Sequence, residues 1–316
     1  MNSFQEKYKR EKTSLFTAKP FLKWAGGKTQ LLEQFNKYFP EELKNGTIKN
    51  YYEPFLGSGA VFFYIAQNYQ IEKAYLSDIN EDLILAFTVV QRNVIELIDE
   101  LYTLKNGYMV RNEIEREKYF YEIRDIFNSE KEKINYNTYS TDWIPRAAKL
   151  IFLNKTCFNG LFRLNRKGEF NVPYGGYENP RILEQSNLIN ASNLLQIAEI
   201  FPTDFENIKN KIISDFFIYF DPPYRPISNT SSFTSYSKYD FTEDDQKRLA
   251  KLFNEISKNG NKLMLSNSDP KNINEDDHFF EEMYSNFRII RVQANRMINS
   301  KGDKRGKINE LLILNY

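Results

Sequence analysis

Cysteine and histidine, on which many active sites depend, are almost absent: the chain of 316 residues contains only Cys157 and His278. Disulfides need paired cysteines, and zinc sites and Ser-His or Cys-His catalytic pairs need more of these side chains than the sequence supplies. The sequence therefore nearly excludes disulfides, a Cys/His zinc site and such catalytic pairs, and it favours a reducing cytosol.

Long apolar runs are also absent. The longest uninterrupted apolar stretches fall far short of the ~18 residues that a membrane-spanning helix needs. The first residues, MNSFQEKYKREK, lack the apolar core of a signal peptide. We therefore expect neither membrane insertion nor export. Residues 1–19 are polar and without periodicity, which predicts a flexible N-terminal tail.

A strong net charge is missing as well, because 43 Lys and Arg nearly balance 42 Asp and Glu. The basic residues are nevertheless gathered in two segments. Residues 146–181 hold seven of them against two acidic residues, and residues 288–307 hold seven against one. This distribution is typical of a protein that binds a polyanion with one face, although a charged segment is often only a solvated surface.

What the sequence does contain is the alternation of an α/β fold. A short aromatic strand, a glycine loop and the start of an apolar helix follow one another in KNYYEPFLGSGAVFFYIA, and a second strand, KAYLSD, comes next. This order predicts a parallel βαβ unit.

The glycine loop is a candidate nucleoside site. Gly57 and Gly59 stand where the strand turns into a helix, and Asp78 follows 21 residues after Gly57, which is the spacing of a carboxylate that binds ribose hydroxyls. Phe62 stands in place of the third glycine of a dinucleotide fingerprint, so a nucleoside without phosphates fits better than a pyrophosphate. A plain turn is the alternative.

The stretch FFIYFDPPYRP, residues 216–226, begins with a continuous apolar run that predicts a strand buried on both faces. Pro222 and Pro223 must end this strand because proline cannot donate to a sheet ladder. In open α/β sheets ligands bind just beyond the carboxyl ends of strands, so Asp221, the two prolines and Tyr224 are placed to do chemistry. A rigid turn is the alternative.

Other patterns predict the surrounding elements. KWAGGK sets Trp24 and Lys28 around a Gly-Gly turn, either beside a cofactor or as a helix entry with a core tryptophan. Residues 79–127 have helical patterning, and a further helix is expected to begin at Pro145. Residues 158–180 are glycine-rich, basic and aromatic, and their apolar residues follow neither the helical nor the strand periodicity. A long irregular stretch of this kind is usually functional.

The C-terminal part continues the alternation. Thr242 and Asp245 form a capping-box pattern at the start of a helix that Gly260 ends. KLMLSNSD predicts the next strand, and FRIIRVQA and INELLILNY predict a terminal strand pair joined by a basic loop, residues 295–307.

Together these motifs resemble one family, the Dam-like class of DNA N6-adenine methyltransferases, including those that accompany GATC-cutting nucleases. The resemblance covers residues 20–316 and rests on KWAGGK, EPFLGSG, SDIN, NGLFRLNRKGEFNVPYG, DPPY, LSNSDP and GKINELLILNY, in this order. It implies a Rossmann-like S-adenosylmethionine-dependent methyltransferase sheet, formed by residues 20–90 and 200–316, with an inserted, mostly helical target-recognition domain, residues 91–199.

The resemblance also implies roles for individual residues. The reaction is assigned to Asp221, Pro222, Pro223 and Tyr224. S-adenosyl-L-methionine, which leaves as S-adenosyl-L-homocysteine, is assigned to Trp24, Lys28, Glu53, Phe55, Gly57, Gly59, Asp78 and Asp221. Contacts with double-stranded DNA are assigned to Asn159, Leu161, Arg163, Asn165, Arg166, Lys167 and Pro173. Independently of the resemblance, Lys304 and Arg305 are expected to contact DNA phosphates because they lie in a basic loop between two strands at the end of the sheet.

DPPY then has a chemical role. The amino nitrogen of adenine shares its lone pair with the ring and is a poor nucleophile until the pair is localised. Asp221 can accept one N–H and the Pro222 carbonyl the other, while Tyr224 stacks on a base that has left the duplex. The methyl donor is already activated by its positive sulfur, so no histidine or metal is required. Cys157 is interpreted as a packing residue, not as the nucleophile of a cytosine methylase.

The family matches Arg163 to the guanine beside the target adenine, and Leu161 and Pro173 to contacts around the thymine, which implies the sequence GATC. An arginine fork suits the O6 and N7 acceptors of guanine. A phosphate contact is the alternative role for Arg163.

Three other functions remain as alternatives: an NAD-dependent oxidoreductase, a non-enzymatic DNA-binding protein, and a methyltransferase acting on RNA or protein glutamine. The first would leave DPPY and the basic segment without a role, and the second would not need Asp221 or the glycine loop. The third does not share the NGLFRLNRKGEFNVPYG segment. We expect a cytoplasmic monomer, with a GATC-specific endonuclease as a possible functional partner.

Overall fold

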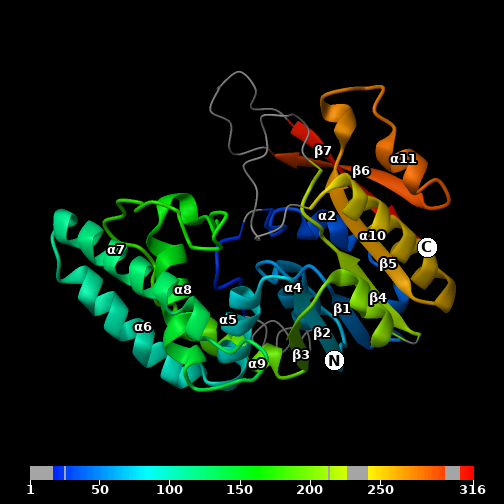
Figure 1. Ribbon diagram of the computed structural model, residues 1–316. Coiled ribbons are helices and arrows are strands. Elements are labelled where there is room, and N and C mark those ends of the chain that lie inside the picture. Colours follow the sequence, from blue (N-terminus) through cyan, green and yellow to red (C-terminus); the bar gives the residue numbers. More distant parts are fainter. Residues whose placement is uncertain (1–16, 25, 213, 226–240, 296–306) are drawn as a thin grey trace, which may run out of the picture. The chain divides into compact units, whose positions relative to one another are not determined.

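The computed structural model describes residues 17–24, 26–212, 214–225, 241–295 and 307–316 (Figure 1). Most of the predicted N-terminal tail lies outside these residues, as does the predicted basic loop from 296 to 306. Contacts divide the chain into two compact units. Unit 1 holds the described residues of Met1–Ala25, Gly57–Asn68 and Asn80–Ala198, and unit 2 holds those of Gly26–Leu56, Tyr69–Ile79 and Glu199–Tyr316.

Unit 2 is built around a seven-stranded sheet with the order β3-β2-β1-β4-β5-β7-β6. The strands are β1 Asn50–Glu53, β2 Lys73–Asp78, β3 Ala198–Pro202, β4 Phe216–Phe220, β5 Lys262–Ser268, β6 Arg288–Asn295 and β7 Lys307–Leu314. Strand β1 is parallel to β2 and β4, β4 is parallel to β5, and β7 runs antiparallel to both β5 and β6.

The strand order reverses at β1, because the chain passes from β1 to β2 and β3 on one side and from β4 to β5 on the other. In doubly wound sheets this switch point, at the carboxyl ends of the strands, is where ligands bind. The prediction of a Rossmann-like α/β sheet with a terminal antiparallel strand pair is confirmed. The carboxyl ends of β1 and β4 place Glu53 and Asp221 at the switch point.

Strand β4 forms where the apolar run predicts it, and all five of its residues are buried. Helix α10, Glu243–Ile256, covers β4 and β5 with Leu249, Leu252 and Phe253 (Figure 1). The predicted capping box starts this helix: the Asp245 N–H donates to the Thr242 hydroxyl, and the Thr242 N–H donates to the Asp245 carboxylate. The smaller elements of unit 2 are α2 Leu32–Asn36, α3 Glu41–Lys44, α11 Phe279–Met283 and the 3-10 turns Phe205–Asn210, Ser257–Asn259 and Pro270–Asn272.

The described part of unit 1 is mostly helical. It contains α4 Ala60–Asn68, α5 Glu81–Arg92, α6 Val94–Met109, α7 Glu113–Ser129, α8 Trp143–Thr156, α9 Gln185–Leu195 and the 3-10 turns Lys131–Lys133 and Phe158–Gly160. Helices α6, α7 and α8 lie side by side, with α8 also against α5 (Figure 1). The buried guanidinium of Arg146 ties α8 to α5 through two bonds to Asp82, of 2.6 and 3.1 Å.

The predicted start of α8 at Pro145 is wrong, because the helix begins at Trp143. The N–H groups of Trp143 and Ile144 already donate to the carbonyls of Ser140 and Thr141, so the first turn forms earlier. Pro145 is tolerated in this turn because its missing N–H has no intrahelical partner there.

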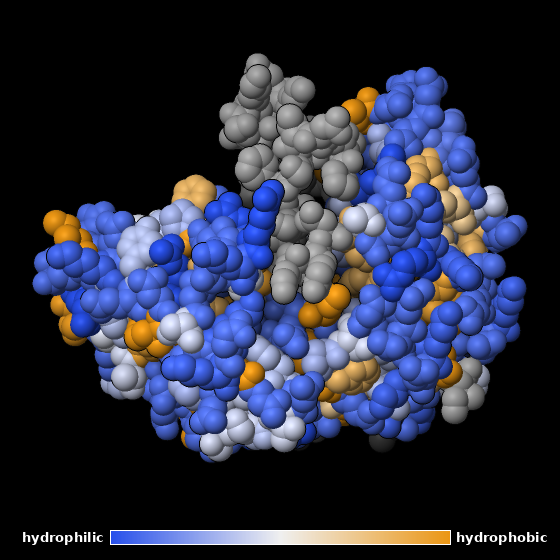
Figure 2. Space-filling model, viewed as in Figure 1, coloured by the Kyte–Doolittle hydropathy of each residue, from blue (hydrophilic) through white to orange (hydrophobic). Residues whose placement is uncertain are grey.

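Hydrophilic residues dominate the face seen in Figure 2, where apolar residues occur in scattered patches. No helix in the described ranges is long and apolar enough to cross a membrane.

Candidate active site and recognition segment

Asp221 directly follows β4, and its carboxylate forms an ion pair with Lys28. The distance from Lys28 Nζ to Asp221 Oδ1 is 2.8 Å, and only 3% of the lysine side chain is exposed. The same ammonium donates to the Gly26 carbonyl at 2.6 Å. The Gly-Gly turn of KWAGGK therefore holds a buried cation against the first residue of DPPY.

A second hydrogen-bond chain reaches Asp221 from the neighbouring strand β5. Ser266 Oγ donates to Asp221 Oδ1 at 2.9 Å and shares a 2.7 Å bond with the Tyr219 hydroxyl. Because the serine proton goes to Asp221, Tyr219 must donate to the serine. Burial raises the pKa of Asp221 above its ordinary value, and Lys28 and Ser266 offset part of the rise. Within the part of the chain that the structure describes, both contacts use Oδ1, so Oδ2 remains as an acceptor for a ligand.

Tyr224, the last residue of DPPY, is held at two places. Its hydroxyl donates to Glu310 Oε2 on β7 at 2.7 Å, and Lys28 Nζ lies 4.6 Å from its ring centroid. The latter is a cation–π distance. Burial raises the pKa of Glu310, and Lys28 and Tyr224 oppose the rise.

The two prolines are fixed differently. Gln246, buried on α10, donates through Nε2 to the Pro223 carbonyl at 3.2 Å. Its Oε1 accepts a hydrogen bond from the Asn267 side chain at 3.3 Å. The Pro222 carbonyl accepts no hydrogen bond from the residues that the structure describes. Asp221 Oδ2 and the Pro222 carbonyl are thus two adjacent acceptors.

Carboxylates surround Tyr219. Burial raises its pKa far above the ordinary value, and the negative charges of Asp221, Glu53 and Glu310 add to the rise. Glu53, at the end of β1, is 2% exposed and accepts a 2.7 Å bond from the Tyr51 hydroxyl. The cluster formed by Lys28, Glu53, Asp221, Tyr224, Ser266 and Glu310, named the switch-point cluster below, therefore contains more carboxylates than cations.

The remaining predicted cofactor residues of unit 2 lie at strand ends. The Asp78 carbonyl, at the end of β2, accepts from the Thr203 N–H at 3.1 Å. Phe55 packs on Phe205 and Phe241, with centroid distances of 5.3 and 5.7 Å, so the aromatic cluster beside the sheet fixes its ring.

In unit 1 the glycine loop packs against aromatic rings. Gly57 has φ +49°, and a Cβ there would lie 3.2 Å from Trp24 Cδ1. Gly59 has φ +70°, and a Cβ there would lie 3.1 Å from the Phe87 ring. The indole of Trp24 stacks on Phe162 with a centroid distance of 5.0 Å. Both glycines are required by backbone conformation and close packing.

Arg163 lies on a short hairpin, residues 163–171. Leu164 and Phe170 form an antiparallel bridge, and the Asn171 N–H donates to the Arg163 carbonyl at 3.1 Å. The Arg163 side chain donates through Nε to Asn171 Oδ1 at 2.8 Å. Asn165 Oδ1 shapes the turn by accepting the N–H groups of Lys167 and Glu169.

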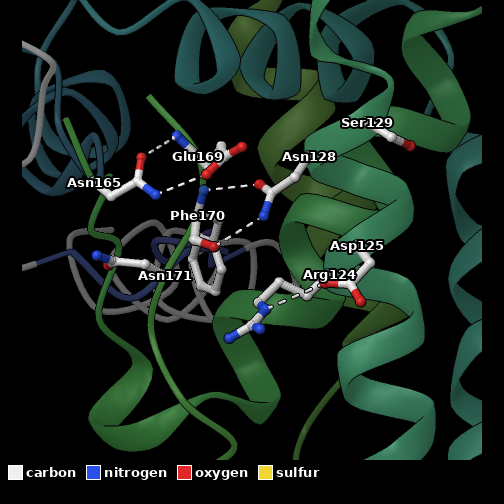
Figure 3. Close-up of a pocket in the computed structure, with 8 residues that line it drawn as sticks. All are labelled: Arg124, Asp125, Asn128, Ser129, Asn165, Glu169, Phe170 and Asn171. Atoms are coloured by element: carbon white, nitrogen blue, oxygen red, sulfur yellow. Dashed lines mark hydrogen bonds and ion pairs between the residues drawn. The ribbon is translucent and has the colours of Figure 1, made fainter. Parts of the chain in front are cut away.

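Helix α7 holds this hairpin from outside, beside a pocket of about 400 Å³ (Figure 3). Asn128 accepts the Phe170 N–H at 2.8 Å and donates to the Phe170 carbonyl at 3.1 Å. Lys131, in the 3-10 turn that follows α7, donates to the Gly168 carbonyl at 3.0 Å. The pocket is lined by Arg124, Asp125, Asn128, Ser129, Asn165, Glu169, Phe170 and Asn171.

The other predicted DNA contacts of unit 1 are exposed or half-buried. Asn159 has the left-handed φ of 56°, and its N–H donates to the Tyr177 hydroxyl at 3.0 Å. The carbonyl of Pro173 accepts the Phe158 N–H at 2.9 Å, and that of Leu161 accepts the Cys157 thiol at 3.2 Å. Arg166 and Lys167 are exposed at the hairpin tip, whereas Lys304 and Arg305 lie outside the described residues.

Cys157 is completely buried, and burial raises the pKa of its thiol to about 12. A thiol in this environment stays protonated and packs, as predicted. Among the described residues, no three His, Cys, Asp or Glu side chains are arranged to hold a metal ion.

The sequence-based prediction missed Ser266, Gln246 and Glu310. Glu310 carried a usable signal, because a lone acidic residue directly precedes the fully buried LLIL of β7. Buried carboxylates need a partner, so such a residue marks a polar site.

The fold and the switch-point cluster define an α/β methyltransferase whose acceptors fit an amino nitrogen. In agreement, a model of the D12 class N6 adenine-specific DNA methyltransferases matches residues 24–298, and the chain belongs to this family. It is 52% identical over 299 residues to the type II methyltransferase M.MjaIII of Methanocaldococcus jannaschii, covering 94% of this chain and 99% of the relative. It is 34% identical over 297 residues to the DNA adenine methylase of Haemophilus influenzae, covering 94% and 93%.

A further relative, the DNA N-6-adenine-methyltransferase of Escherichia phage P1, is 34% identical over 316 residues, covering 98% of this chain and 37% of the relative. The predicted activity is therefore confirmed: the chain is an adenine-specific DNA methyltransferase, and family membership implies S-adenosylmethionine as the donor. The oxidoreductase and the non-enzymatic DNA-binding protein are excluded.

Proposed function

We propose that the enzyme methylates the adenine of GATC after this base has left the duplex, and that DPPY holds its amino group. The observation that carries the proposal is the pair of acceptors at the end of β4. Asp221 Oδ2 and the Pro222 carbonyl can each accept one N–H, which localises the nitrogen lone pair. Tyr224 offers a ring for stacking, as enzymes that act on extruded bases require.

The charge of the switch-point cluster supports a cationic cofactor. Two carboxylates of this cluster, Glu53 and Asp221, outnumber its one cation, Lys28, and burial raises the pKa of Asp221. S-adenosylmethionine supplies a methyl group on positive sulfur, and negative potential stabilises that charge. Lys28 and Asp221 would hold the charged groups of the cofactor, with Glu53, Phe55, Asp78, Trp24, Gly57 and Gly59 as further binding residues.

The environment of Arg163 supports base recognition. In the described ranges its guanidinium donates to Asn171 alone, through the side-chain oxygen at 2.8 Å and the backbone oxygen at 3.4 Å. Among the described residues it has no carboxylate within ion-pair distance, so its charge is not neutralised. A guanidinium oriented by a neutral amide is suited to bind guanine O6 and N7. Leu161 and Pro173 would contact the thymine.

The remaining contacts follow from exposure and charge. Arg166 and Lys167, exposed at the hairpin tip, would bind phosphates, and Asn159 and Asn165 would also contact the DNA. Lys304 and Arg305 would bind phosphates because they lie between the two terminal strands in the sequence. The insert, residues 91–199, would act in target recognition, and residues 20–90 and 200–316 would form the catalytic domain. We further propose that the enzyme is a cytoplasmic monomer that can protect DNA from a GATC-specific endonuclease.

The test is methylation of matched duplexes that contain GATC or one of its twelve single-base variants with tritiated S-adenosylmethionine, followed by identification of the modified base. We expect N6-methyladenine in GATC, at a rate about 10- to 100-fold higher than in any variant, since one mismatched base pair costs about 1–3 kcal/mol. Equal rates on all duplexes would refute the GATC proposal. Label on cytosine would refute the role of DPPY.

A further inference from the structure

The ring of Tyr224 is restrained at both its edge and one face. Its hydroxyl is tied to Glu310 at 2.7 Å, and the Lys28 ammonium lies 4.6 Å from the ring centroid. A phenol oxygen lies on the axis about which the ring rotates, so the Glu310 bond fixes where the ring points but not its rotation. The cation over the face disfavours the rotations that would remove it.

Glu310 is itself rigidly placed. It lies on β7 between two strands, opposite Ser268 of β5 and Val292 of β6, so its backbone belongs to the sheet. Its side chain is partly buried beside the ion pair of Lys28 and Asp221. Burying a carboxylate there costs free energy unless the carboxylate is paired or hydrogen-bonded. An acceptor anchored in the sheet is better suited to orient a mobile ring than one on a loop.

We propose that Glu310 is a positioning residue for methyl transfer: it accepts the Tyr224 hydroxyl and thereby holds the ring with one face toward Lys28 and the other open to the target adenine. The inference rests on the proposed stacking of Tyr224 on the extruded base. It assigns a function to the hydrogen bond and not to the negative charge of Glu310.

Three single variants separate the bond from the charge. Glu310→Gln keeps an acceptor oxygen and removes the charge, Glu310→Ala removes the acceptor, and Tyr224→Phe removes the donor but keeps the ring. We expect kcat to fall about tenfold in E310A and in Y224F, which corresponds to about 1.4 kcal/mol. E310Q should stay within about threefold of wild type. KM for S-adenosylmethionine should change less than about twofold, because the ring acts on the base.

The double variant E310A/Y224F gives the sharpest measurement. Since both substitutions break the same bond, kcat should fall no further than in either single variant. A duplex with 2-aminopurine at the target position gives a second readout. Its fluorescence should be higher in E310A and Y224F than in wild type, because a loosely held ring stacks less on the extruded base.

Tyr284→Phe is the matched control. It also removes a buried tyrosine hydroxyl from unit 2, but the rings that pack on Tyr284 are Phe253, Phe280 and Phe287, none of which belongs to DPPY. Its kcat should equal that of wild type. Thermal unfolding of each variant shows whether a loss of kcat reflects unfolding.

Three results would overturn the inference: a kcat of E310A within twofold of wild type, a loss in E310Q as large as in E310A, or additive losses in the double variant. Failure of the proposed function would look different. Wild type would then show no preference for GATC or no N6-methyladenine, whatever the variants do.

Discussion

The switch-point cluster and the 163–171 hairpin use opposite means to hold their polar groups. The cluster is built from buried charges, with Lys28 against Asp221 at 2.8 Å and further carboxylates nearby. In the hairpin, the Arg163 side chain and the Phe170 backbone are held by the neutral amides of Asn171 and Asn128.

The difference follows from what each region must do. A reacting centre gains from fixed charges in a water-poor site, where they stabilise charge development without reorganising. A recognition residue must keep its charge for the nucleic acid, so a neutral amide orients it without neutralising it. Substitutions should therefore lower the rate in the cluster and the discrimination between bases in the hairpin.

The largest effect should come from Asp221→Ala. It removes one acceptor for the target amino group and leaves the buried Lys28 without its ion pair, so we expect methyl transfer to fall by at least about 10²–10³-fold. Single-turnover kinetics with saturating GATC duplex and S-adenosylmethionine measure this. Transfer within about tenfold of wild type would mean that Asp221 does not hold the amino group.

A smaller and different effect is expected from Arg163→Ala. Preference for guanine at the first position should fall by about 10- to 100-fold, because a bidentate arginine–guanine pair contributes about 1–3 kcal/mol of discrimination. The measurement is kcat/KM on GATC and on its three first-position variants.

Arg166→Ala is the control for the hairpin. This exposed residue should act on all sequences alike and lower the salt dependence of binding by about one unit of log-log slope. If Arg163→Ala behaves in the same way, Arg163 binds a phosphate and the comparison between the two regions fails.

The pH dependence of stability should distinguish the cluster as well. Since burial raises the pKa of Asp221 above its ordinary 3.8, the folded protein binds a proton at Asp221 more tightly than the unfolded chain does. The stability from this group is complete below pH 3.8 and is lost as the pH rises through the raised pKa. Urea unfolding of wild type and Asp221→Asn at several pH values measures this. As the pH rises from 3.8 through the raised pKa, the free energy of unfolding of wild type should fall relative to that of the variant.

Glu42→Gln is the control of opposite sign, since a hydrogen bond from Lys262 lowers the pKa of Glu42 below its ordinary 4.5. The stability that Glu42 contributes is present above pH 4.5 and is lost as the pH falls through the lowered pKa. A difference between wild type and Asp221→Asn that stays constant with pH would contradict the raised pKa of Asp221.

The smallest effect should be a gain. Tyr284 is completely buried, and its hydroxyl has no hydrogen-bond partner among the described residues. An unsatisfied buried hydroxyl is unfavourable, so Tyr284→Phe should raise the free energy of unfolding by about 1 kcal/mol. Urea unfolding at neutral pH measures this, and a loss of stability would show that the hydroxyl is satisfied after all.

Local steric rules made much of the fold and the activity readable in the sequence. The apolar run of β4, the prolines that end it and the Thr242–Asp245 capping box all depend on residues close together in the chain, and each forms as predicted. The motif order identified the family. The start of α8 was placed two residues too late, because the Ser140 and Thr141 carbonyls that begin its first turn leave no pattern in the sequence.

The sequence by itself thus determined the βαβ architecture, the position of DPPY at a strand end and the class of reaction, because periodicity, proline and glycine act locally. Only the tertiary structure decided that Lys28 pairs with Asp221, that Ser266 joins them from β5 and that Glu310 holds Tyr224. These contacts join residues far apart in the chain. They depend on strand order and register, which place β5 beside β4 and Glu310 opposite Ser268, and no local pattern specifies that placement.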